Sequence, residues 1–227
     1  MGRTMPAGTA ELIIFDFDGV IADSETLANQ VLAERLTQLG FATSLEDAFE
    51  HYMGRHWTDC LRIFEALWGC PAPSTLPLDV HAECERRLGD LREVPGAAAF
   101  IRRNAARAQC IASSSTPDWI ERRLRLFGLA ERFEQRTFSA AIHVARGKPH
   151  PDIYLHAARA MSVDPRRAVV IEDSPTGVAA GAAAGAMVVG LCAGSHVRPG
   201  HAERLAAAGA RYVCHSFEEV DRLLAAG

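Results

Sequence analysis

Short apolar runs alternate with longer amphipathic stretches along most of the chain. Five of these runs predict buried strands, at residues 12–15, 110–112, 168–171, 187–189 and 212–214. Because helical stretches separate the runs, the strands are expected to be parallel, since parallel neighbours need a crossover connection and are buried on both faces. The pattern therefore predicts an α/β fold with a doubly wound, mostly parallel sheet and a Rossmann-like core.

Residues 24–93 break this alternation, because they contain helical patterns but no strand run of similar quality. Asp23 and Ser24 are candidate N-caps for a first helix, and Gly40 is a natural terminator. A proline-rich stretch at 70–77 divides the segment. We therefore expect an α/β core formed by residues 1–23 and 94–227, and an all-helical inserted domain at 24–93.

Composition and charge exclude several classes of protein. The 227 residues are 48% hydrophobic, enough for one core and a small appended domain. The net charge of -4 offers no basic excess for nucleic acid, which is not expected as a partner. No long apolar stretch precedes Ile13, so we expect no membrane partner and a cytoplasmic protein with six free cysteines. A monomer is expected, because no long apolar seam is present.

Polar side chains follow three of the predicted strands directly. They are Asp16 and Asp18 after the first run, Ser113 and Ser114 after the second, and Glu172 and Asp173 after the third. Because ligands of such sheets bind beyond the carboxyl ends of the strands, these side chains are expected to converge. For the serines alone, ordinary turn and cap roles are the alternative.

Four carboxylates at one edge of a sheet repel one another unless a cation or a proton offsets their charge. A hard, oxygen-seeking cation is the economical explanation, and Mg²⁺ suits a site with few protein ligands better than Ca²⁺ does. No histidine or cysteine cluster accompanies the acids, which argues against zinc. Lys148, within Gly147-Lys148-Pro149, would balance charge there and hold a phosphoryl group; the alternative is a solvated loop charge.

Taken in order, these motifs resemble the haloacid dehalogenase-like hydrolase superfamily, in the branch with a helical cap after the first motif. The motifs are DFDGV at 16–20, Ser113, Lys148 before Pro149, and the Glu172-Asp173 pair followed by SPTG. Within the superfamily the chain resembles the sugar-phosphate phosphatases and β-phosphoglucomutases, which share the GKP-x-P-D-x-(Y/F) stretch at 147–154. The resemblance implies that the insert is a cap over the active site.

The resemblance also implies catalytic roles. Asp16 would be the nucleophile that forms an aspartyl-phosphate, and Asp18 would act as general acid and base. Ser113 and Lys148 would hold the phosphoryl oxygens, with Ser114 as a further substrate-binding residue. A small phosphorylated metabolite is the implied partner.

The implied Mg²⁺ cofactor would be held by Asp16, the backbone carbonyl of Asp18 and the side chain of Asp173, with Glu172 bound directly or through water. In the cap, Gly54, Arg55 and His56 are candidates for substrate contact, because a glycine-hinged turn carries a cation and an imidazole. The alternative for this segment is a surface arginine beside a core tryptophan, Trp57.

We expect a Mg²⁺-dependent phosphatase of a sugar phosphate or sugar-acid phosphate. The alternatives are a β-phosphoglucomutase-type mutase and a non-catalytic metabolite-binding module. Mutases of this branch carry a cap histidine just after the first motif, whereas residues 23–36 contain none and Ala28 stands about where it would fall. Six further histidines are expected at the surface or in loops and not as ligands: His143, His150, His156, His196, His201 and His215.

Overall fold

The computed structural model describes residues 9–53 and 57–226. The candidate substrate-binding residues Gly54, Arg55 and His56 lie outside the described residues. The chain divides into two compact units, one formed by Met1–Ala22 and Arg92–Gly227 and the other by Asp23–Leu91. We call them the core unit and the helical unit, and the role of the helical unit as a cap stays a prediction.

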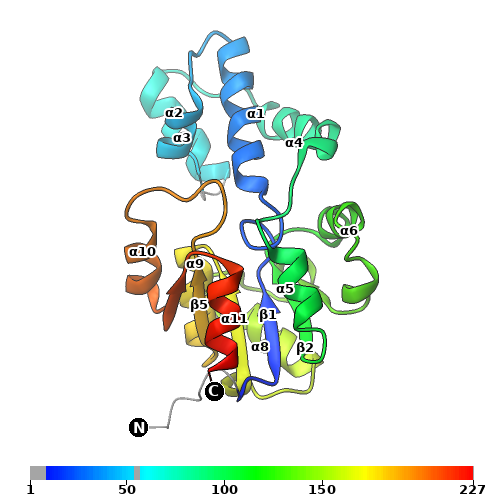
Figure 1. Ribbon diagram of the computed structural model, residues 1–227. Helices are drawn as coiled ribbons and strands as arrows, with labels where there is room; N and C mark the ends of the chain where they lie inside the picture. The colour runs from blue at the N-terminus through cyan, green and yellow to red at the C-terminus, as the bar shows by residue number, and fades with distance from the viewer. Residues whose placement is uncertain (1–8, 54–56, 227) are drawn as a thin grey trace. The chain divides into compact units, whose positions relative to one another are not determined.

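The core unit is built on a six-stranded sheet in the order β3-β2-β1-β4-β5-β6, with each pairing parallel (Figure 1). The strands are β1 (Leu12–Phe15), β2 (Ala108–Ser113), β3 (Thr137–Ser139), β4 (Ala168–Glu172), β5 (Met187–Leu191) and β6 (Tyr212–Cys214). The helices are α5 (Ala97–Arg103), α6 (Pro117–Leu126), α7 (Ala140–His143), α8 (Asp152–Ala160), α9 (Pro175–Ala183), α10 (His201–Ala208) and α11 (Phe217–Ala225), with the short 3-10 helices η3 (Glu131–Phe133) and η4 (Pro165–Arg167). The predicted doubly wound α/β fold is confirmed.

Alternate residues of β1 pack against different helices, which explains why the whole strand is apolar. Leu12 and Ile14 belong to a buried cluster that includes side chains of α8 and α9. Phe15 points to the other face, where its ring lies 6.0 Å from that of Phe100 in α5. Phe100 in turn packs against Phe217 of α11, at 4.9 Å between ring centroids. A strand covered on both faces cannot alternate between apolar and polar residues.

Three strands extend beyond the predicted runs and one was not predicted: β4 ends at Glu172 and β5 at Leu191, past the predicted residues 171 and 189. β2 begins at Ala108, before the predicted residue 110, because Gln109 is fully buried and its side-chain amide donates to the carbonyls of Ile101 and Asn104. A polar residue satisfied in this way interrupts an apolar run without ending the strand. β3 was not predicted, since it has three residues at the edge of the sheet and only Phe138 is apolar among them.

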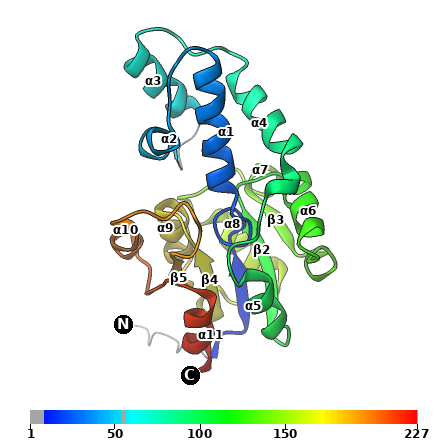
Figure 2. The same ribbon diagram turned by 45° about the horizontal axis from the view of Figure 1, so that its top comes forward.

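In the helical unit, the described residues form α1 (Ser24–Gln38), α2 (Leu45–His51), α3 (Trp57–Trp68), α4 (Leu76–Arg86) and the short 3-10 helix η2 (Leu88–Asp90) (Figure 2). α1 follows Asp23 as predicted, and Gly40 lies just past its end with a φ of 92°. Trp57 is 37% exposed, so the alternative that placed it in the core is wrong.

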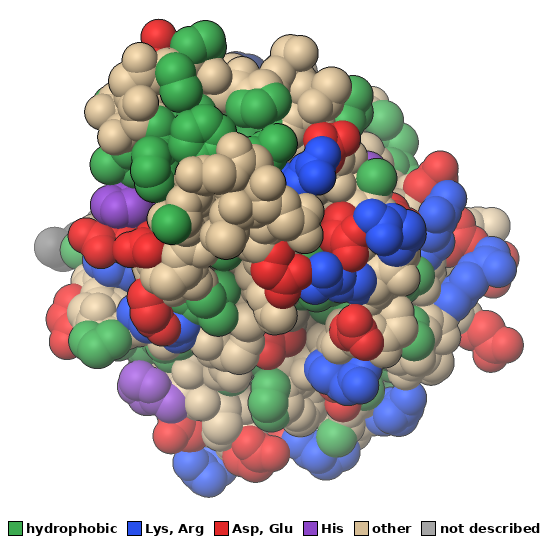
Figure 3. Space-filling model, turned by 90° about the horizontal axis from the view of Figure 1, so that it is seen from above, with side chains coloured by type: hydrophobic (Ala, Val, Ile, Leu, Met, Phe, Trp, Pro, Cys, Tyr) green, Lys and Arg blue, Asp and Glu red, His purple; other side chains and the backbone are tan. Residues whose placement is uncertain are grey.

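Where charged side chains lie on the face seen in Figure 3, acidic and basic ones are next to one another, in keeping with the small net charge of -4, whereas the upper left part of this face is mostly uncharged. Within 9–53 and 57–226, no helix combines the length and the apolar character needed to cross a membrane.

Candidate active site

Three neighbouring strands bring the predicted acidic and hydroxyl residues to one edge of the sheet. β1 lies between β2 and β4 and is parallel to both, so the residues that follow these three strands lie at the same edge of the sheet. Asp16 directly follows β1 and its backbone N–H donates to the carbonyl of Ile171 in β4. Ser113 ends β2 and Glu172 ends β4. This is the carboxyl edge at the point where the strand order reverses, the usual ligand site of an open parallel sheet.

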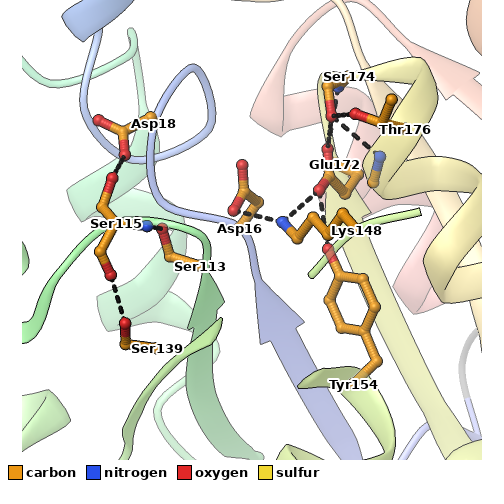
Figure 4. Close-up of polar contacts among 11 residues, drawn as sticks. Asp16, Asp18, Ser113, Ser115, Ser139, Lys148, Tyr154, Glu172, Ser174 and Thr176 are labelled. Atoms are coloured by element: carbon orange, nitrogen blue, oxygen red, sulfur yellow. Dashed lines mark hydrogen bonds and ion pairs between the residues drawn. The ribbon is translucent and has the colours of Figure 1, made fainter. Parts of the chain in front are cut away.

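A buried lysine joins two of the carboxylates. The Lys148 ammonium donates to Asp16 Oδ1 at 2.7 Å and to Glu172 Oε1 at 2.6 Å (Figure 4). Its side chain is only 6% exposed, so the alternative of a solvated loop charge is wrong. Lys148 is also the single lysine of the chain. The structure therefore places Lys148 at the acidic edge, as predicted from the motif.

The cluster carries more negative charge than the lysine offsets. Carboxylate oxygens of Asp16, Glu172 and Asp173 all lie within 4.8 Å of one another, and all three residues are buried. Burial, then the Glu172 charge, raises the pKa of Asp16 well above its usual range, and the same two causes raise the pKa of Asp173. When all three carboxyls are ionised, they and one ammonium leave two negative charges, which a divalent cation would neutralise.

Lys148 itself stays protonated in this setting. Burial alone would lower the pKa of its ammonium, but the charges of Asp16 and Glu172 outweigh burial and raise that pKa well above the usual value. The lysine is thus a fixed positive charge beside Asp16 and not a base.

Glu172 is held by donors on both of its oxygens. Oε1 accepts from Lys148 and from the Tyr154 hydroxyl, at 2.6 and 2.8 Å. Oε2 accepts from the backbone N–H and the hydroxyl of Ser174, at 2.9 and 3.0 Å. Four donors fill the lone-pair sites of one carboxylate, so Glu172 is oriented toward the lysine by the protein itself.

One carboxylate oxygen of Asp173 receives no hydrogen bond from the described residues. This oxygen is Oδ1, and it is buried. A buried carboxylate oxygen without a donor is unfavourable, and a cation would satisfy it. Gly19 makes room for this side chain, because it has a φ of 80° and a Cβ there would lie 1.9 Å from Asp173 Oδ2. The donor set and the buried Oδ1 fit a hard divalent cation.

Asp18 lies beside a different set of donors. Its Oδ2 accepts from the Ser115 hydroxyl at 2.6 Å and its Oδ1 from the indole N–H of Trp119 at 3.2 Å. The Ser139 hydroxyl donates to the carbonyl of Ser115, and Ser113 Oγ accepts from the Ser115 N–H (Figure 4). The turn between β2 and α6 thereby orients the carboxylate of Asp18.

The structure brings together most of the predicted site residues of the core unit, and it shows further residues that support them. Asp16, Lys148, Glu172 and Asp173 form one cluster, and Ser113 is buried near the turn that holds Asp18, whereas Ser114 is exposed. The supporting residues that sequence analysis missed are Ser115, Trp119, Tyr154, Ser174 and His196. Of these, Tyr154 stands in the stretch 147–154 and Ser174 in the SPTG after the acidic pair, both of which are motifs quoted for the resemblance.

Two histidines were misjudged in part. His201 was expected at the surface or in a loop, but it begins α10 and is 5% exposed, so that prediction is wrong. His196 does lie in a loop, yet its side chain is 2% exposed. The sequence around them is polar and rich in glycine, so it gives no sign that both rings pack inward.

Replacing Ser174 with alanine should separate its two roles. Its hydroxyl caps α9 by accepting from Gly177 N–H and also donates to Glu172. We expect Ser174→Ala to lose about 1 kcal/mol of unfolding free energy in urea denaturation, together with a several-fold lower turnover.

Ser216 provides the matched control, because it caps α11 by accepting from Glu219 N–H and is not at the acidic cluster. Ser216→Ala should lose similar stability and keep full turnover. Equal turnover losses in the two variants would mean that the Ser174 contact with Glu172 has no role in the reaction.

The sheet order and the site define a doubly wound α/β protein with a buried acidic site whose residues fit a divalent cation. The chain belongs to the haloacid dehalogenase-like hydrolase family, whose model matches residues 10–185. The family expected from the motifs is confirmed, and the chain is a hydrolase of that family.

The chain is similar in sequence to named proteins over most of its length. It is 26% identical over 191 residues to 6-phosphogluconate phosphatase of Escherichia coli, covering 83% of this chain and 86% of the relative. It is 32% identical over 180 residues to a phosphorylated carbohydrates phosphatase of Thermotoga maritima, covering 77% and 82%. A HAD family hydrolase from Deinococcus radiodurans, crystallised with bound phosphate and sodium, is 32% identical with a TM-score of 0.81, over 96% of both chains.

Proposed function

We propose that this protein hydrolyses the phosphate monoester of a small phosphorylated carbohydrate or sugar acid, through a phosphorylated Asp16 and with Mg²⁺ as cofactor. One observation carries the proposal: the only lysine of the chain is buried between Asp16 and Glu172 at the carboxyl edge of the sheet, in a cluster with Asp173. The names of the two relatives support the class of substrate.

The proposed metal ligands are the carboxylates of Asp16 and Asp173 and the backbone carbonyl of Asp18. Glu172 reaches the ion through water in this proposal, because its lone-pair sites already accept four hydrogen bonds from Lys148, Tyr154 and Ser174. When bound, Mg²⁺ screens the charge between an anionic nucleophile and an anionic phosphate.

Each protein group then has a defined task. Asp16 attacks phosphorus, and its acyl-phosphate is later hydrolysed by water, which divides one difficult displacement into two easier ones. Asp18, oriented by Ser115 and Trp119, gives a proton to the leaving alkoxide and later accepts one from the attacking water. Lys148 holds the phosphoryl oxygens with a fixed positive charge.

In this proposal the helical unit acts as a cap that excludes water and selects the substrate. Ser114 is proposed to contact the substrate from the core unit, in keeping with its exposure at the end of β2. The substrate roles proposed for Gly54, Arg55 and His56 rest on the sequence alone.

The proposal is tested by phosphate release from a panel of phosphate monoesters, with Mg²⁺ and with EDTA. We expect Mg²⁺-dependent release, fastest for a phosphorylated carbohydrate or sugar acid such as 6-phosphogluconate. The panel includes β-glucose 1-phosphate with its bisphosphate activator. Conversion of this compound to glucose 6-phosphate, faster than release of phosphate, would replace the proposal with a mutase. No turnover of any compound would favour a non-catalytic binder.

Adding Mg²⁺ should stabilise the protein more at pH 8 than at pH 5. The pKa values of Asp16 and Asp173 are raised by burial and by Glu172, so in the metal-free protein their contribution to stability is present at acidic pH. That contribution is lost as pH rises through the folded-state pKa values, when the carboxyls ionise and repel one another. At pH 8, Mg²⁺ at about 100 times its Kd should add about 2.7 kcal/mol to the unfolding free energy.

Thermal melts at the two pH values, with Mg²⁺ and with EDTA, measure this difference. Asp173→Asn provides the control and should lose most of the Mg²⁺ effect at pH 8. An equal or larger Mg²⁺ effect at pH 5 would contradict the charge balance derived for the cluster.

A further inference from the structure

Two buried histidines contact Asp173. His196 lies in the loop between β5 and α10, and its Nε2 is 3.0 Å from Asp173 Oδ2. His201, the first residue of α10, has its Nε2 2.7 Å from the backbone carbonyl oxygen of Asp173. One ring thus contacts the side chain of Asp173 and the other its backbone.

The hydrogen bonds of His201 define its tautomer. Arg204 Nη2 lies 3.0 Å from His201 Nδ1, and a guanidinium can only donate, so Nδ1 accepts. Nε2 therefore carries the proton and donates to the carbonyl of Asp173. Burial lowers the pKa of His201, in keeping with a neutral ring. His201 is thus a fixed donor that ties α10 to the end of β4.

The backbone around His196 is shaped for its ring. A Cβ on Gly194 would lie 2.6 Å from both Cε1 and Nδ1 of His196, and 3.3 Å from the carbonyl oxygen of Gly19. The glycine thus lets the loop after β5 pass close to the loop after β1 while the imidazole fits between it and Asp173. The rings of His196 and His201 meet edge to face, with centroids 5.7 Å apart.

The two oxygens of Asp173 have different surroundings as a result. Oδ2 contacts the imidazole of His196, while the buried Oδ1 has no hydrogen-bond partner among the described residues. A carboxylate held at one oxygen presents the other in a single direction, which lowers the entropy lost when that oxygen binds a ligand.

We propose that His196 is a positioning residue for the metal site: its imidazole restrains Oδ2 of Asp173 and leaves Oδ1 for the cation, and His201 fixes the backbone of Asp173. This inference rests on the proposed function, because it assumes that Asp173 is a metal ligand. Partners that orient a ligating carboxylate commonly contribute 10-fold to 100-fold to metal affinity, about the effect expected here.

The test is the affinity of the full chain for Mn²⁺, used as a spectroscopic substitute for Mg²⁺ and measured by electron paramagnetic resonance and calorimetry without substrate. We expect His196→Ala to weaken Mn²⁺ binding roughly 10-fold to 100-fold. His196→Gln should recover most of that affinity, because its amide N–H can reach the position of Nε2. Gly194→Ala should also weaken binding, since it displaces the ring and leaves the imidazole in the protein.

Two further variants make the result interpretable. His215→Ala removes an exposed histidine and should bind Mn²⁺ as the wild type does. Asp173→Asn should lose most of the affinity, which tests the proposed metal site itself. Melting of the metal-free proteins by circular dichroism establishes that each variant is folded. If His196→Ala is not folded, the Mn²⁺ affinity of Gly194→Ala tests the role of His196 instead.

The outcomes separate the two proposals. If the wild type does not bind Mn²⁺, or if Asp173→Asn binds it as tightly, the metal site of the proposed function is wrong and this inference fails with it. If Asp173→Asn loses affinity while the folded His196→Ala and Gly194→Ala proteins bind Mn²⁺ as the wild type does, the role of His196 alone is wrong. Failure of His196→Gln to recover affinity would likewise overturn positioning through Nε2.

Discussion

Replacing Asp16 with asparagine is expected to reduce phosphate release by about 10⁴-fold or more, measured as kcat at saturating Mg²⁺. The amide has no anionic oxygen to attack phosphorus, so the proposed covalent route is lost. The amide can still accept a hydrogen bond from Lys148, which contacts Oδ1 in the native protein. The fold should therefore persist, with a near-UV circular dichroism spectrum like that of the wild type.

The exposed Asp118 near the start of α6 is the matched control, and Asp118→Asn should keep full activity. Because asparagine can deamidate back to aspartate, Asp16→Ala is measured beside it. An Asp16→Ala protein that keeps more than about one tenth of wild-type turnover would be incompatible with Asp16 as the nucleophile.

Replacing Lys148 with methionine should impair both activity and stability. Loss of the ammonium removes the donor to Asp16 and Glu172 and leaves their carboxylates buried without it. Removing one partner of a buried ion pair costs roughly 3–5 kcal/mol, which urea denaturation in EDTA should detect. Turnover should fall by about 10²-fold to 10³-fold, the range for loss of one group that stabilises transition-state charge.

Arg103 forms an ion pair with Asp221 at 2.5 Å, but its side chain is 50% exposed. Arg103→Met therefore serves as the control, with a stability loss of at most about 1 kcal/mol and unchanged turnover. Lys148→Arg should not restore the wild-type rate, because a planar guanidinium does not replace a compact ammonium between two carboxylates. Wild-type turnover in Lys148→Met would remove Lys148 from the proposed mechanism.

The sheet could be predicted from sequence because its central strands are buried on both faces. Leu12 to Phe15 and Ala168 to Ile171 are continuous apolar runs for this reason, and the polar residues that end them mark the edge where ligands bind. The edge strand β3 gives no such run, since only its neighbour β2 pairs with it and it spans three residues.

The acidic cluster was equally visible in the sequence, because each of its carboxylates immediately follows or ends a strand. The groups that orient them were not. Trp119 and Tyr154 lie within helices, where an aromatic residue is ordinarily part of the core, and their hydrogen bonds to Asp18 and Glu172 join residues 101 and 18 positions apart. Such contacts depend on how the loops pass one another at the sheet edge, and no local periodicity encodes that arrangement.

His196 illustrates the same limit. A histidine after Gly194 in a polar loop has the local signature of a surface residue. Its burial follows from the close approach of the loop to Gly19, a residue about 180 positions earlier in the chain. The proposed selection of substrate by the helical unit cannot be predicted from sequence patterns, because it would depend on the shape of a pocket and not on a motif.

The most direct test of the account is to trap the phosphorylated enzyme. The protein is mixed with Mg²⁺ and its best substrate, quenched during turnover and treated with borohydride, which reduces an acyl-phosphate to the alcohol. Peptide mass spectrometry should then find homoserine at position 16, and only when substrate was present. Release of phosphate at the full rate with aspartate unmodified at position 16, or with homoserine at another acidic residue, would contradict the central claim that Asp16 carries the phosphoryl group.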